Sequence, residues 1–71
     1  MGETRRDKFK RLATNRTKVV LNALRLLGNL SNRANYDYSD EDLAKIFRAI
    51  EEQLRIVKAK FQSKLKREFK L

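Results

Sequence analysis

Basic side chains gather at both ends of this 71-residue chain, and their chemistry is the binding of anions. Residues 1–25 contain eight Lys or Arg and two acids, and residues 54–71 contain seven and one. Residues 26–53 are acidic, with three cations and six acids. Because Lys and Arg neutralise nucleic-acid phosphates and release counterions, the candidate nucleic-acid-binding residues are Arg5, Arg6, Lys8, Lys10, Arg11, Lys60, Lys64, Lys66, Arg67 and Lys70.

Residues that catalyse reactions are scarce. The chain has no His and no Cys, which removes the usual acid–base group near neutral pH, the thiol nucleophile and an ordinary zinc site. Gly28 precedes Asn29 and Leu30, so it does not begin a phosphate-binding loop of the GK[ST] type. The carboxylates of residues 40–42 fit a helix cap better than a metal site. We therefore predict a protein without enzymatic activity, bound metal or cofactor.

Two amphipathic helices are expected to hold these cations. Over residues 5–27 apolar side chains recur every three or four positions, the period of one helix face: Phe9, Leu12, Ala13, Val19, Val20, Ala23, Leu24 and Leu27. A second series covers residues 39–68: Leu43, Ile46, Phe47, Ile50, Leu54, Val57, Phe61 and Leu65. With no proline and two glycines, the chain has little that would interrupt either helix.

Short local patterns mark the helix ends. Ser39 and Asp42 form an S-x-x-D capping box, in which Ser39 is the N-cap and Asp42 the third helical residue. Three carboxylates in this first turn complement the positive end of the helix dipole. Gly28 is expected to end the first helix as a C′ residue with positive φ.

The connection over residues 28–38 is rich in Asn, which favours turns. Tyr36 and Tyr38 are two residues apart, so an extended segment would place both rings on one side. They are candidate partner contacts, and packing over the helix ends is the alternative interpretation. The run from Leu27 to Asp42, followed by Ile46 and Phe47, resembles a family of short bacterial proteins over about residues 8–61. That resemblance implies that the connection matters more than an ordinary linker, and it implies no catalytic or binding residue.

These elements predict an all-α fold with one domain over residues 1–71, an antiparallel two-helix hairpin that pairs into a dimeric four-helix bundle. A lone hairpin would leave much of each apolar series in water, and a chain of this length buries only about 60% of its unfolded surface. A second copy, or a larger protein, would cover the apolar residues. Folding back once would also bring the two basic ends together, and an anionic partner would relieve their repulsion.

The leading hypothesis is a small non-catalytic accessory or regulatory protein that contacts nucleic-acid phosphates. The alternative is an inhibitor or adaptor that docks on a larger protein through its apolar series or its connection. The longest apolar run, residues 19–21, is too short for a membrane span, and the lack of Cys fits a cytoplasmic location. A connection of about ten residues argues against a helix-turn-helix, whose turn has three or four. The sequence does not distinguish DNA from RNA.

Overall fold

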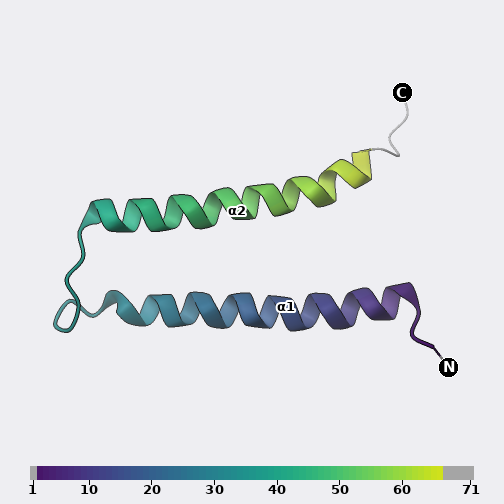
Figure 1. Cartoon of the computed structure of the whole chain (residues 1–71), viewed down its shortest axis with the longest axis horizontal. Coiled ribbons are helices and arrows are strands. Elements are labelled where there is room, and N and C mark those ends of the chain that lie inside the picture. The colour runs from purple at the N-terminus through teal and green to yellow at the C-terminus, as the bar shows by residue number, and fades with distance from the viewer. Residues whose placement is uncertain (1, 67–71) are drawn as a thin grey trace. The chain divides into compact units, whose positions relative to one another are not determined.

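The computed structural model describes residues 2–66, with side chains described for residues 2–62 (Figure 1). Its elements are α1 (Arg5–Gly28), a short 3-10 helix η1 (Asn29–Ser31) and α2 (Asp40–Lys66). The chain divides into two units between Asp37 and Tyr38, so that α1 and η1 belong to one and α2 to the other. The all-α prediction is therefore confirmed for residues 2–66. The antiparallel pairing, the single domain and the four-helix bundle stay predictions.

α1 begins where the periodicity predicts, and a side-chain cap sets its first turn. The Thr4 hydroxyl accepts a hydrogen bond of 2.9 Å from the Asp7 backbone N–H, and the Thr4 carbonyl accepts one of 2.9 Å from Lys8. The first bond occupies a donor that the first turn of a helix otherwise leaves without a partner, and the second is the first i→i−4 bond of the helix. Residues 4–7 have the T-x-x-D pattern, so the reasoning applied to residues 39–42 would also have found this cap.

The predicted end of α1 is wrong in its geometry. Gly28 lies inside the helix with φ −62° and ψ −26°, and no glycine among the described residues has positive φ. The Asn29 N–H instead reaches the carbonyls of Arg25, Leu26 and Leu27, which tightens the chain into η1. Because the 3-10 turn satisfies the last carbonyls and the chain then leaves in extended conformation, no left-handed residue is needed.

This geometry predicts that Gly28→Ala stabilises α1. A Cβ added at Gly28 meets nothing within 4 Å, and Ala loses less backbone entropy than Gly on entering a helix. We expect about 0.5–1 kcal/mol of added helix stability, measured by circular dichroism during urea unfolding. Gly2→Ala is the matched control because Gly2 has equal space but precedes the helix. A destabilised Gly28→Ala protein would contradict the helical backbone at this position.

α2 begins with the predicted capping box. The Ser39 hydroxyl accepts a hydrogen bond of 3.0 Å from the Asp42 N–H, and the Asp42 carboxylate accepts one of 2.9 Å from the Ser39 N–H. The first turn contains three carboxylates, which interact favourably with the positive end of the helix dipole: Asp40, Glu41 and Asp42. α2 is described to Lys66, so the predicted extension over residues 67 and 68 lies outside the described residues.

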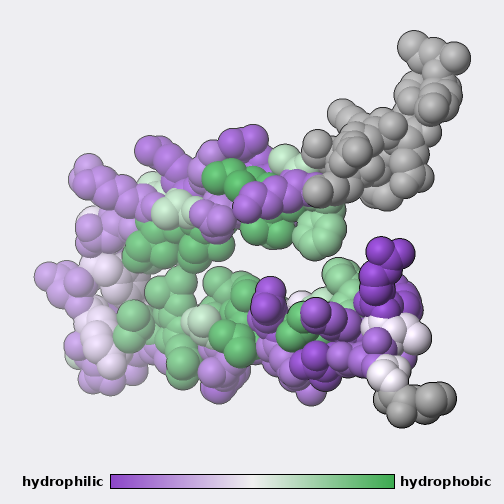
Figure 2. Space-filling view, turned by 45° about the vertical axis from the view of Figure 1, so that its right-hand side comes forward, coloured by the Kyte–Doolittle hydropathy of each residue, from purple (hydrophilic) through white to green (hydrophobic). Residues whose placement is uncertain are grey.

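The apolar side chains of both helices remain open to solvent. None of the side chains of residues 2–62 is buried, although Leu12, Leu27 and Ile50 are half-buried. Phe47 and Leu54, in the predicted apolar series of α2, are 50% and 51% exposed. Figure 2 shows the hydrophobic side chains of α2 gathered along one side of that helix. Neither unit therefore has a core of its own within the described side chains. In the described part of the chain no helix has the length and apolar character that crossing a membrane requires.

Candidate nucleic-acid interface

The structure places half of the predicted nucleic-acid-binding cations on the first two turns of α1. Five of them are exposed there: Arg5, Arg6, Lys8, Lys10 and Arg11. Lys60 is exposed on α2. Lys64 and Lys66 belong to α2, but their side chains are outside the described ones, and Arg67 and Lys70 lie outside the described residues altogether. The meeting of the two basic ends stays a prediction because α1 and α2 belong to separate units.

Arg11 is held by an acid that precedes the helix. Its Nε donates to the Glu3 carboxylate at 2.7 Å and its Nη2 donates at 3.0 Å, which makes a two-point ion pair. The Arg11 guanidinium lowers the pKa of the Glu3 carboxyl below its ordinary value of 4.5, and Glu3 in turn raises the pKa of Arg11. Any phosphate that binds Arg11 through both nitrogens must compete with Glu3 for the same donors.

The ion pair predicts how Glu3 titrates. Its folded pKa lies below 4.5, so the contribution of the pair to stability is present above that pH and is lost as the pH falls through the lowered pKa. A carbon-13 NMR titration of the Glu3 carboxyl should report this low pKa. Arg11→Gln should return it toward 4.5, while Lys10→Gln, on a neighbouring exposed residue, should leave it lowered. An ordinary pKa in the unaltered protein would contradict the pair.

The two helices differ sharply in charge. α1 carries eight cations and one acid, a net charge of +7, whereas α2 carries seven cations and five acids, a net charge of +2. Within the described side chains of α2, Lys45 lies 4.0 Å from Glu41, and Arg55 lies 2.6 Å from Glu52. The hydrogen bond from Arg55 lowers the pKa of Glu52. Such exposed pairs stabilise a helix only slightly, but each acid offsets the positive charge of the cation beside it.

All eight cations of α1 lie in the predicted basic segment, residues 1–25. Three of them are exposed but are not among the predicted nucleic-acid-binding residues: Arg16, Lys18 and Arg25. No acid occurs from residue 8 to residue 36. This run without Asp or Glu is the feature of the sequence that indicates a positive surface beyond Arg11.

The connection is ordered by Asn32. Its side-chain oxygen accepts a hydrogen bond of 2.9 Å from the Ala34 N–H, and its carbonyl accepts bonds of 3.1 and 3.0 Å from Asn35 and Tyr36. This turn confirms the expected role of Asn in the segment.

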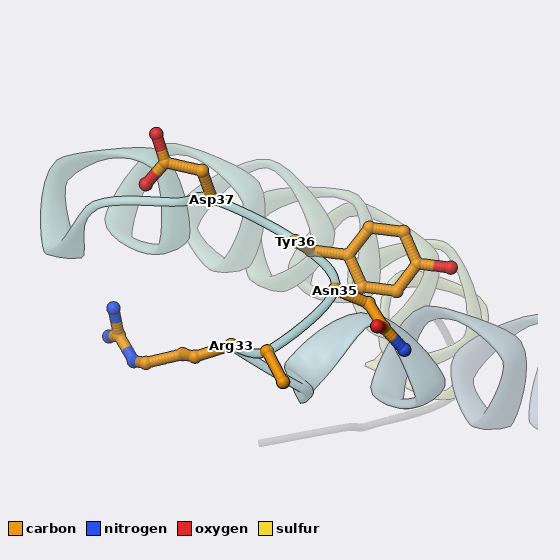
Figure 3. A pocket seen from close by; sticks show the side chains of 5 residues that line it. Arg33, Asn35, Tyr36 and Asp37 are labelled. Atoms are coloured by element: carbon orange, nitrogen blue, oxygen red, sulfur yellow. The ribbon is translucent and has the colours of Figure 1, made fainter.

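A shallow hollow of about 360 Å³ lies beside this turn and is lined by residues 33–37 (Figure 3). The Arg33 and Tyr36 side chains point in opposite directions, so they do not enclose a ligand between them. Tyr36 is 48% exposed and Tyr38 is half-buried. Of the two predicted partner contacts, Tyr36 therefore offers the larger accessible surface, and the contact itself stays a prediction.

Comparison with known proteins gives no further guide to function. Among the described residues, no group of three or more acids is placed to hold a metal ion. No protein-family model, curated protein or solved structure matches the chain. The resemblance of residues 27–42 to a family of short bacterial proteins thus has no match to support it. The features that bear on function are the charge of α1 and the exposed apolar side chains of both helices.

Proposed function

We propose that the protein is a small non-catalytic accessory or regulatory factor that contacts nucleic-acid phosphates through its basic ends. The observation that carries this proposal is the net charge of +7 on α1, with every cation of that helix exposed. A helix face that only needs to be soluble usually mixes both signs. Like charges on one helix repel one another, and an anionic polymer relieves that repulsion.

We infer further that the apolar series of the two helices form the contact with a second copy, in a dimeric four-helix bundle of two antiparallel hairpins. The support is the exposure of large apolar side chains in both units, which for Val19 and Phe61 reaches 69% and 57%. Small domains without disulfides or metals commonly gain a sufficient core by association. This arrangement would also bring the basic end of α2 beside that of α1.

The same exposure favours one alternative function. An amphipathic helix can lay its apolar face in the groove of a larger protein, with aromatic anchors at intervals of one or two turns. Phe47, Leu54 and Phe61 follow one another at seven-residue intervals and are each about half exposed. In that case the protein would act as an inhibitor or adaptor, and its cations would keep it soluble.

Salt-dependent binding separates these two functions. The unaltered protein should bind a fluorescently labelled nucleic acid in an anisotropy assay, and the logarithm of its affinity should fall linearly with the logarithm of the salt concentration. Each phosphate contact contributes about 0.7–0.9 to the slope. Absence of binding at low salt, or an affinity that salt leaves unchanged, would overturn the nucleic-acid proposal. Light scattering with and without nuclease in the same preparation measures self-association independently of bound nucleic acid.

A further inference from the structure

Three exposed cations form a row along α1, here called the cationic row: Arg11, Lys18 and Arg25. They are seven residues apart, which is about two helical turns, so their side chains emerge on the same side of the helix. The row is about 21 Å long at 1.5 Å per residue. Of the three, only Arg11 is among the predicted nucleic-acid-binding residues, so the row adds Lys18 and Arg25 to the predicted surface.

Short polar side chains accompany the cationic row. Asn15 and Asn22 follow Arg11 and Lys18 by four residues, the spacing of neighbours on a helix surface. The Asn22 side-chain oxygen accepts a hydrogen bond of 2.6 Å from the Arg25 guanidinium, which holds that cation along the row. Lys, Arg and Asn side chains are the groups that commonly contact phosphate oxygens.

Three members of the predicted apolar series lie on the other side of α1, whereas Leu21 stands three residues from Lys18 and four from Arg25 and therefore borders the row. Phe9, Val20 and Leu27 each stand two residues from a member of the cationic row, and residues two apart do not share a helix face. A partner that covers Phe9, Val20 and Leu27 therefore leaves the cationic row accessible. The row and the proposed dimer contact can be occupied at the same time.

We propose that the cationic row binds double-stranded DNA, so that contact runs along α1 to Arg25 instead of stopping at Arg11. This inference rests on the proposed function and adds the surface and the kind of nucleic acid. Surfaces for single strands use aromatic rings on which bases stack. The only aromatic residue of α1 is Phe9, on the apolar side.

The dimensions of the helix favour DNA over duplex RNA. An α-helix with its side chains is about 10–12 Å across, and the major groove of B-form DNA is about 12 Å wide. The major groove of A-form RNA is deep and too narrow for side chains to read. A row of about 21 Å corresponds to roughly six base pairs at 3.4 Å each.

The test uses the full-length protein with Lys18 and Arg25 both changed to Gln. Its binding to a labelled DNA duplex of roughly 20 base pairs, about three times the length of the row, is measured across a salt series. We expect the log–log slope to fall in magnitude by about 1.8, and the affinity to drop at least tenfold at moderate salt. The variant with Lys45 and Arg48 changed to Gln, two exposed cations of α2 in the acidic middle of the chain, should keep the slope of the unaltered protein.

A second variant, with Lys18→Arg and Arg25→Lys, keeps both charges at the same positions and should keep the slope. A loss of slope in this variant equal to that of the Gln pair would overturn the inference, because the effect would not follow charge. So would an unchanged slope in the Gln pair, or tighter binding of duplex RNA or single strands of the same length. Circular dichroism of every variant should show equal helix content. If changing Arg5, Arg6, Lys64 and Arg67 together to Gln weakens binding and the Lys18 and Arg25 pair does not, this inference fails and the proposed function stands. If the unaltered protein binds no nucleic acid, both fail.

Discussion

Leu54→Asp should dissociate the protein into monomers and lower its helix content in the same step. Leu54 is 51% exposed on α2 and lies in the apolar series that the proposed dimer buries. A carboxylate placed in that contact would lose its hydration without gaining a partner, at a cost of several kcal/mol. Isolated helices are marginal in water without such packing. Analytical ultracentrifugation and circular dichroism over a range of protein concentrations would measure both effects. Leu24→Asp in α1 should behave in the same way.

Ala59→Asp is the matched control for Leu54→Asp. It adds the same charge to an exposed position of α2 outside the apolar series, and it lowers helix propensity by a similar amount. We expect it to leave the assembly intact. An unaltered protein that stays monomeric and fully helical at high micromolar concentration would refute the dimer. A second result would favour docking on a larger protein: the unaltered protein is monomeric, and its helix content rises when a protein extract depleted of nucleic acid is added. The docking function would then replace the dimer only after the bound protein was identified.

The second large effect concerns the basic ends. Changing Arg5, Arg6, Lys64 and Arg67 together to Gln should weaken nucleic-acid binding to a similar degree for every nucleic-acid sequence, because phosphates carry no sequence information. If all four contact phosphates, the log–log slope on a DNA duplex should fall in magnitude by about 3.6. Anisotropy with two duplexes of unrelated sequence and a common salt series would measure the change.

The control for this variant lies in the acidic middle of the chain. Arg33, Lys45 and Arg48 changed together to Gln remove three charges but should change the slope little. Lys45 stands 4.0 Å from Glu41, and the start of α2 carries three carboxylates that repel phosphate. Equal losses in the two variants would mean that only net charge matters and that no defined surface binds. If the affinity and its salt dependence stay the same when Arg5, Arg6, Lys64 and Arg67 are changed, these residues do not belong to the binding site.

Local features of the structure follow directly from neighbouring residues, and the sequence predicts them well. The Ser39–Asp42 box appears with both of its hydrogen bonds, and the same pattern at Thr4 accounts for the start of α1. The row formed by Arg11, Lys18 and Arg25 likewise needs only helical spacing to be recognised. All these features join residues that a single helix turn or a whole number of turns brings together, so the helix alone determines them.

The end of α1 shows where such reasoning stops. Glycine after an apolar run is typical of a left-handed helix end, yet Gly28 is helical because the following residues continue as a 3-10 turn. The path of the chain after the helix decided which of two common endings is used. The spacing of apolar residues identifies the sides of α1 and α2 that need a partner, but not the partner. Burial depends on which distant surfaces meet, within one chain or between two, and no pattern of near neighbours encodes that choice.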